Sequence, residues 1–174
     1  RSIQNDKGKS DNLPLINAST SHYDKLNNYD KLSNKGPKIM RISTKGRYGT
    51  MAMLDLALHY GESPILVKDI ARRQHISGRY LEHLLISLKV AGMVRSVRGT
   101  RGGFTLAKPP SQIRLSEIIQ VMEGSMAPTD CVDDPETYPR AALCAVYDVW
   151  VEVKAAINGI LESTTLQDLL ERQR

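Results

Sequence analysis

The fold is decided by the stretch SGRYLEHLLISLKVAG, residues 77–92, which runs directly into MVRSVRGTRGGFTL, residues 93–106. In the first part, apolar side chains recur at the spacing of one helix face, at Tyr80, Leu81, Leu84, Leu85 and Leu88. This pattern predicts an amphipathic helix that starts at Ser77 as its N-cap and is closed by Gly92. In the second part, Met93–Val97 and Gly103–Ala107 predict two strands joined by a turn rich in glycine and arginine.

Outside this stretch, hydrophobic periodicity and capping signals predict further helices. They are expected from Ser43 to near Gly61, over Val67–Gln74, over Ser116–Glu123 with a serine cap, from about Ala145 to Leu161, and over Thr165–Glu171. His75–Ser77 would form the turn of a helix-turn-helix, and prolines predict an irregular acidic loop over Gly124–Leu143. The predicted fold class is therefore mainly α with a small β-wing: a winged helix-turn-helix plus a long C-terminal dimerisation helix.

Charge and composition divide the chain into three predicted parts. Residues 1–39 are polar, repeat Tyr-Asp-Lys-Leu and lack sustained periodicity, so we expect a disordered leader or tag. Residues 40–110 hold 12 Lys/Arg against 4 Asp/Glu, a net charge of +8, and residues 111–174 hold 5 against 11, a net charge of −6. A basic part joined to an acidic part predicts a DNA-binding domain over 40–110, followed by a sensing loop and dimerisation helices over 111–174.

Side chains suited to reading duplex DNA gather on the predicted second helix and the wing. Arg79 has the donors for guanine, Glu82 accepts from the cytosine amino group, and His83 does either. Arg72 and Arg73 are expected to add phosphate contacts. An isolated surface arginine is usually solvated, so the prediction depends on the ordered group. The predicted DNA-binding residues are Arg41, Ser43, Lys45, Arg47, Lys68, Ser77, Arg79, Tyr80, Glu82, His83, Arg98, Gly99 and Arg101.

Several function classes are disfavoured by what the sequence contains. Two cysteines are too few for a disulfide scaffold and indicate a reducing compartment. No apolar run approaches the ~20 residues that span a bilayer, so we expect a cytoplasmic protein that does not contact a membrane. No Ser/His/Asp or Cys/His arrangement stands out as catalytic, so we do not expect an enzyme.

Three segments resemble the IscR/NsrR/CymR regulators, the bacterial Rrf-two family. They are MRISTKGRYG at 40–49, ISGRYLEHL at 76–84 and VRGTRGGFTL at 97–106. The resemblance implies a homodimeric winged-helix transcription regulator that binds double-stranded promoter DNA, with a long helix pairing the protomers. It also implies that Glu82 matches a carboxylate that tunes the promoter class and that Arg98 matches the wing arginine. Many members bind a [2Fe–2S] or related cluster in the loop before the long helix.

In that loop the chain departs from the family pattern of three cysteines. Cys131 and Cys144 match the first and third, Tyr138 stands where the middle cysteine is expected, and Tyr147 replaces a histidine found in some members. A cluster normally takes four ligands, so two thiolates leave two unidentified. Three interpretations stay open: a [2Fe–2S] cluster completed by carboxylates or a partner protomer, a thiol pair that forms a disulfide or reacts directly with oxidants, and a loop with no redox role that recognises a partner.

The function predicted is an IscR-type, sequence-specific regulator that senses cluster or redox status through Cys131 and Cys144. The alternative is a cluster-free regulator that responds through its thiols or docks an enzyme of sulfur metabolism. A second alternative is a nucleoid-binding protein without promoter specificity. It predicts similar affinity for target and random duplexes, whereas a specific regulator is expected to show a ratio of ~10³ or more.

Overall fold

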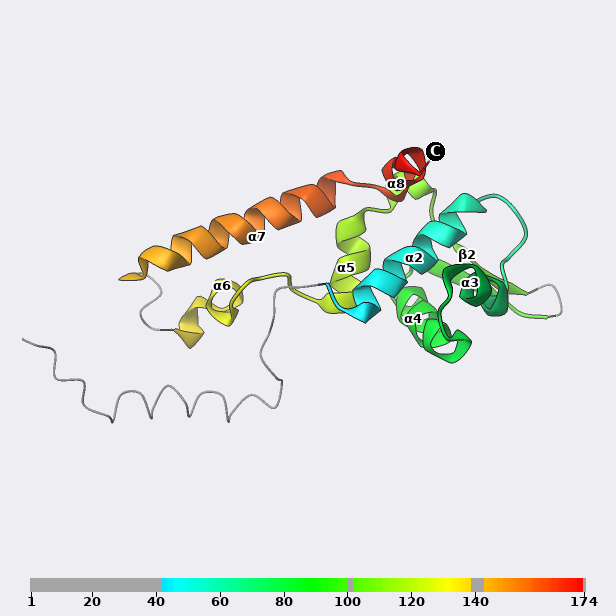
Figure 1. The fold of residues 1–174 in the computed structure, drawn as a ribbon, viewed down its shortest axis with the longest axis horizontal. Coiled ribbons are helices and arrows are strands. Elements are labelled where there is room, and N and C mark those ends of the chain that lie inside the picture. The colour runs from blue at the N-terminus through cyan, green and yellow to red at the C-terminus, as the bar shows by residue number, and fades with distance from the viewer. Residues whose placement is uncertain (1–41, 100–101, 139–142, 174) are drawn as a thin grey trace, which may run out of the picture. The chain divides into compact units, whose positions relative to one another are not determined.

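A computed structural model of the chain describes residues 42–99, 102–138 and 143–173 (Figure 1). The predictions for residues 1–39, Arg41 and Arg101 lie outside these ranges. Within them, the chain is mainly helical with one two-stranded antiparallel sheet, as the sequence predicts. The longer elements are α2 (Thr44–Leu58), α3 (Val67–Gln74), α4 (Gly78–Val90), β1 (Val94–Val97), β2 (Gly103–Leu106), α5 (Leu115–Glu123), α7 (Ala145–Ser163) and α8 (Leu166–Arg172).

The three helices of the helix-turn-helix region share one hydrophobic core. Met53 and Leu56 of α2, Ile70 of α3 and Leu81, Leu85 and Leu88 of α4 are all buried. Full burial of a side chain of this size contributes roughly 1.5–3 kcal/mol. His75 ends α3 in the left-handed conformation, with φ of 53°, so the chain turns sharply into α4. The core therefore fixes the orientation of α4, so that the polar face of this helix is exposed.

The end of α4 and the wing follow the predicted signals closely. Gly92 N–H donates to Lys89 O at 2.9 Å and Met93 N–H donates to Leu88 O at 2.9 Å, which is a Schellman closure. β1 pairs with β2 in the register Val94–Leu106, and Ile65 adds an isolated bridge to Phe104. Gly103 is required beside that bridge, because a Cβ there would lie 2.3 Å from Ile65 O.

Helices α5 and α8 complete the same core from the C-terminal half of the chain. Ile118 and Met122 of α5 and Leu166 of α8 are buried with the residues of α2 and α4. Thr165 caps α8, as predicted: Asp168 N–H donates to its hydroxyl at 3.2 Å. In return, the Thr165 hydroxyl and N–H donate to the Asp168 carboxylate and lower the pKa of that group.

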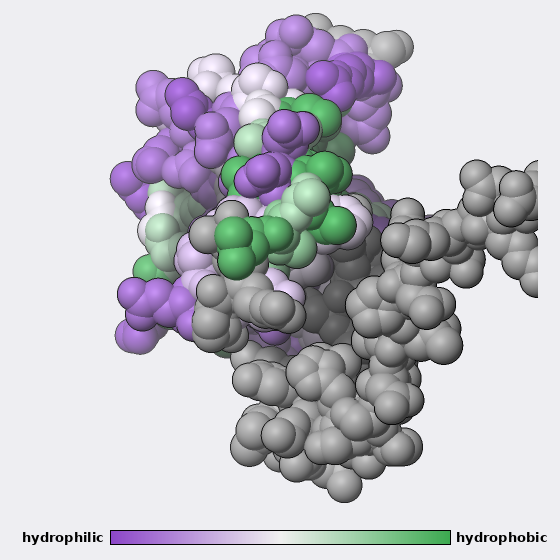
Figure 2. Space-filling model, turned by 90° about the vertical axis from the view of Figure 1, so that its left-hand side faces the viewer, coloured by the Kyte–Doolittle hydropathy of each residue, from purple (hydrophilic) through white to green (hydrophobic). Residues whose placement is uncertain are grey.

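Helix α7 is packed quite differently. Of the described residues of α7, Leu161 alone is buried, while Val146, Val149 and Ile160 are 52%, 50% and 67% exposed. Helix α7 contacts α5 and the short helix α6 (Asp130–Asp133). Figure 2 looks at the end of the molecule where α7 begins and shows green hydrophobic surface between purple hydrophilic residues. No helix in the described ranges is long and apolar enough to cross a membrane.

Two local predictions were wrong, and a third was confirmed without its expected hydrogen bond. The segment 124–143 is not wholly irregular, since α6 and a 3-10 turn over Pro135–Thr137 form in it. Helix α5 begins at Leu115 without a serine cap, because Glu117 accepts a hydrogen bond from Arg114 N–H at 2.9 Å instead. Ser77 is the N-cap residue of α4, as predicted, although its side chain makes no capping hydrogen bond. This helix end is exposed, so solvent can satisfy its N–H groups.

Candidate nucleic-acid interface

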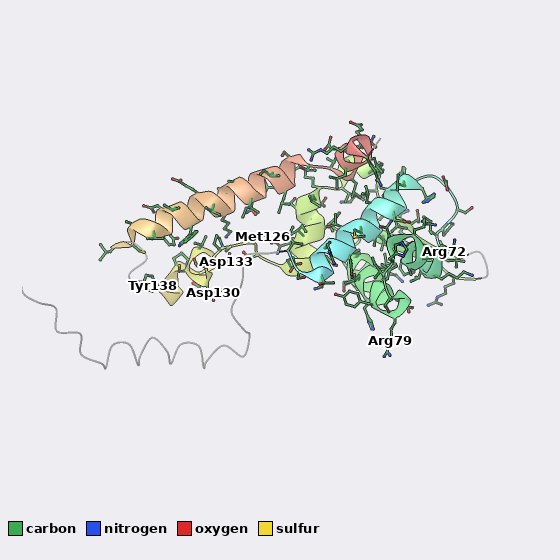
Figure 3. All side chains as sticks on the ribbon, viewed as in Figure 1. Arg72, Arg79, Met126, Asp130, Asp133 and Tyr138 are labelled. Atoms are coloured by element: carbon green, nitrogen blue, oxygen red, sulfur yellow. The ribbon has the colours of Figure 1, made fainter. Side chains whose placement is uncertain are left out.

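The outward face of α4 carries the side chains expected to read DNA. Arg79, Glu82 and His83 are exposed, whereas the leucines of the opposite face are buried. Positions 79, 82, 83 and 86 share one face, because residues three and four apart are neighbours on a helix. In Figure 3 the labelled Arg79 projects from α4 away from the rest of the helices. The structure thus leaves these three polar groups together on one accessible surface.

An aromatic pair joins the first turn of α4 to α2. The rings of Tyr80 and Tyr48 meet edge to face, with centroids 6.2 Å apart and planes at 76°. The guanidinium of Arg47 lies over Tyr48, with its Cζ 4.9 Å from the ring centroid, in a cation–π contact. Tyr80 therefore has a packing role within the predicted interface. Arg47 and Lys45 are both exposed on α2, which packs against α4.

Among the basic residues of α3, Arg73 differs from its neighbours. Its Nε donates to Asp55 Oδ2 at 3.0 Å and its NH2 group to Asp55 Oδ1 at 2.5 Å, while Gln74 Nε2 donates to Asp55 Oδ2 at 2.9 Å. Burial alone would raise the pKa of Asp55, but these hydrogen bonds and the charge of Arg73 outweigh it and lower the pKa. Arg73 thus fastens α3 to α2. Arg72 and Lys68 stay exposed, and Arg72 pairs loosely with Asp69 at 3.4 Å.

Ser43 is also occupied by a contact within the chain. Its hydroxyl donates to Glu123 Oε1 at 2.6 Å and its N–H donates to the same oxygen at 3.0 Å. Gly46 N–H donates there too, at 2.9 Å. Glu123 was not among the predicted site residues, because it lies 80 residues from Ser43 and no local pattern links the two. A carboxylate at this place complements the positive end of the α2 dipole.

The α2–α5 contact at this point is unusually close. A Cβ on Gly49 would lie 2.6 Å from the Met122 sulfur, and one on Gly46 would lie 2.2 Å from Glu123 Oε1. The two helices therefore approach through glycines, and their relative position leaves no room for larger residues.

The wing presents a second basic surface. Arg98 and Gly99 are exposed at the turn after β1, as predicted. Arg95, which the sequence analysis did not include, is exposed on β1 itself. The alternation of inward Val94 and outward Arg95 is the signal that could have identified it.

Both cysteines lie in the segment between α5 and α7, Cys131 inside it and Cys144 at its C-terminal end. Cys131 is in α6, with its sulfur 3.2 Å from the Thr129 hydroxyl, and Cys144 is the N-cap residue of α7. Both are free and partly exposed. In the described part of the chain no group of three or more His, Cys, Asp or Glu residues could hold a metal ion. The described residues of one chain therefore do not supply the four ligands that a [2Fe–2S] cluster normally takes.

Nearby carboxylates of this segment are engaged with polar groups. Asp133 Oδ1 accepts from the Ser125 hydroxyl at 2.6 Å and from Lys154 Nζ of α7 at 2.9 Å. In Figure 3, the labelled Asp130 and Asp133 belong to α6, which is drawn below α7. Asp133 therefore ties the segment after α5 to the middle of α7.

A winged helix-turn-helix whose second helix exposes a polar face is typical of one class of protein, the DNA-binding transcriptional regulators. The chain belongs to the Rrf2 family, because the family model described as "Iron-dependent Transcriptional regulator" matches residues 42–172. It is 41% identical over 130 residues to the HTH-type transcriptional regulator CymR of Bacillus subtilis, covering 75% of this chain and 89% of the relative. Its relatives are named as transcriptional regulators, and the chain is not an enzyme.

Two experimental structures show the same fold. The structure of CymR, the global cysteine regulator of B. subtilis, has a TM-score of 0.64 at 39% identity and covers 76% of this chain and 97% of that one. The structure of IscR from T. potens has a TM-score of 0.64 at 42% identity and covers 77% of this chain and 88% of that one. The predicted family and fold class are confirmed.

Proposed function

We propose that this chain is a cytoplasmic, homodimeric regulator that binds promoter DNA sequence-specifically through α4, and that the segment between α5 and α7 carries its signal. The observation that supports this most strongly is the outward face of α4, where Arg79, Glu82 and His83 are exposed together. The 13 residues of α4 span about 20 Å. An exposed helix of this size fits the major groove of B-DNA.

In this proposal, base reading and backbone positioning are separate tasks. Arg79 donates to guanine, Glu82 accepts from cytosine, and His83 contacts a neighbouring base. Lys45 and Arg47 of α2, Lys68 and Arg72 of α3, and Arg98 of the wing contact phosphates. Arg73 is left out of this set, because Asp55 already holds its guanidinium.

The exposed stripe on α7 supports the homodimer. Val146, Val149, Val153, Ala156 and Ile160 follow one another at spacings of three and four residues. That is the a/d spacing of a coiled-coil seam, and the same stripe on a second copy would cover it. Two α4 helices would then meet successive major grooves of a palindromic site.

The contacts of Glu123 and Asp133 support a route from the signal segment to α4. Lys154 binds Asp133, and Asp133 binds Ser125, two residues beyond Glu123. Glu123 in turn holds the start of α2, whose Tyr48 packs against Tyr80 of α4. A change at the cysteines would in this way alter the position of the reading helix relative to α7.

For the signal itself, the donor set favours thiol chemistry over a cluster built within one chain. The family implies a [2Fe–2S] group, which Cys131 and Cys144 would hold only with ligands from another source. A relative named IscR and a relative named the global cysteine regulator are similarly close. Anaerobic purification followed by absorption, iron and sulfide assays separates the two. A colourless, iron-free protein whose DNA affinity changes on thiol oxidation supports thiol sensing, and stoichiometric iron and sulfide contradict it.

Two further results would decide between the redox proposal and the partner-docking alternative. If Cys131→Ala and Cys144→Ala leave promoter affinity unchanged under both reducing and oxidising conditions, the redox proposal fails. Specific co-purification of a sulfur-metabolism enzyme that binds the segment would then favour the partner-docking alternative.

The DNA-binding proposal is tested by selecting operators from a random duplex library and measuring affinities by fluorescence anisotropy. Arg79→Ala is expected to weaken operator binding by about 1–3 kcal/mol and to relax preference at one base position. Arg172→Ala, on α8, removes another exposed positive charge and serves as the control. Equal losses for both variants would contradict the assignment of α4 as the reading helix.

A further inference from the structure

The outward face of α4 also carries an apolar side chain that the polar reading set does not use. Ile86 is 46% exposed and lies on the same face as Arg79, Glu82 and His83. Its neighbours Leu84, Leu85 and Leu88 are buried, so Ile86 is not part of the core. Because Ile86 is exposed on this face, it can pack against an apolar group of the surface that the face meets.

The position of Ile86 sets where that partner would lie. It follows Arg79 by seven residues, which is almost two turns and about 10 Å along the helix axis. One base step of DNA is about 3.4 Å along each strand, so this separation corresponds to roughly three base pairs. The one apolar group that B-DNA presents in the major groove is the C5-methyl of thymine.

We propose that Ile86 is a specificity-determining residue that packs against a thymine methyl about three base pairs from the base read by Arg79. The inference depends on the proposed function, since it assumes that α4 enters the major groove. Ile86 adds selectivity for thymine over cytosine, which lacks the methyl. Burial of one methyl-sized group corresponds to about a fourfold change in affinity per half-site, and about fifteenfold for both halves of a symmetric operator.

The test replaces each thymine of the selected operator by deoxyuridine, symmetrically in both half-sites, because this removes the methyl and leaves the base pair unchanged. The full chain is expected to lose about fifteenfold in affinity at one position. Ile86→Ala is expected to bind the unmodified operator more weakly by a similar factor and to be insensitive to deoxyuridine there. Ile86→Val keeps a branched side chain and is expected to keep most of the sensitivity.

Val90→Ala provides the matched control, since Val90 is 85% exposed one turn further along α4. It is expected to retain the full response to deoxyuridine. The inference is overturned if no thymine position affects the full chain, or if Ile86→Ala keeps the same response. Failure of the proposed function is distinguishable, because the chain would then bind selected and random duplexes equally and would overturn both.

Discussion

The region that we propose reads DNA, formed by α2, α3 and α4, differs from α7 in where its apolar side chains lie. We call α2, α3 and α4 the reading region. In α2, α3 and α4, most apolar side chains are buried in one core, and the exposed face is largely polar, with Ile86 and Val90 of α4 as exposed apolar exceptions. In α7, the most regular apolar stripe is the exposed one, and among its described residues Leu161 alone is buried. The α2–α4 region has a buried core, whereas α7 leaves Val146, Val149 and Ile160 at least half exposed.

This difference matches two requirements of the proposed function, DNA reading and dimerisation. A reading helix needs a rigid support, which the buried leucines and the Asp55–Arg73 pair supply from within one chain. A helix that pairs two protomers needs complementary surface from another molecule. The predictions below test each side of this comparison.

The largest effect is expected from charging the α7 stripe. Val149→Asp with Val153→Asp would place four carboxylates in the seam of a dimer, so we expect a monomer by sedimentation. DNA affinity is expected to fall about 100- to 10,000-fold, because one reading head loses the avidity of two. Ala155→Asp is the control, since Ala155 is exposed on the opposite side of α7. A double variant that still sediments as a dimer would show that the seam lies elsewhere.

The next effect concerns the support of the reading region. Arg73→Met keeps the aliphatic bulk but leaves the Asp55 carboxylate, which is 1% exposed, without its main partner. We expect the free energy of unfolding in urea to fall by about 2–3 kcal/mol, below the usual cost for a fully buried pair because Arg73 is partly exposed. Arg72→Met is expected to change stability by less than about 0.5 kcal/mol. Equal effects would mean that the pair contributes no more than a surface charge.

A smaller effect is expected where the two regions meet. Glu123→Gln keeps the shape of the side chain but removes the charge at the start of α2, so we expect a loss of about 1 kcal/mol of unfolding free energy. Glu162→Gln, at an exposed position of α7, is the control. No difference between these two variants in urea titrations would argue against Glu123 as the link between α5 and α2.

The smallest effect is expected in the pH dependence of stability. The folded state lowers the pKa of Asp55, so its carboxylate contributes stability that is fully present above the unfolded-state pKa of about 3.9. That contribution is lost as the pH falls through the folded-state pKa. The stability difference between the wild type and Asp55→Asn is therefore expected to shrink on acidification. Urea titrations of both proteins at successive pH values measure it, and a difference that grows instead would reverse the assigned sign.

The sequence predicted what local patterns control and missed what distant contacts control. Leucine spacing, Gly92 and the paired glycines of the wing located α4 and the hairpin, because each acts within a few residues. The roles of Ser43 and Arg73 are set by Glu123 and Asp55, which lie 80 and 18 residues away. The serine cap expected for α5 was wrong, because the helix begins at Leu115, ahead of Ser116, and Glu117 accepts a hydrogen bond from the N–H of the N-cap residue Arg114.

The most direct test of the account is the specificity ratio of the full chain at physiological salt. Fluorescence anisotropy with the selected operator and with a scrambled duplex of equal composition gives the two dissociation constants. The account predicts operator binding tighter by ~10³ or more, with the preference reduced in Arg79→Ala. A ratio near one would contradict sequence reading by α4 and would support a nucleoid-binding protein without promoter specificity.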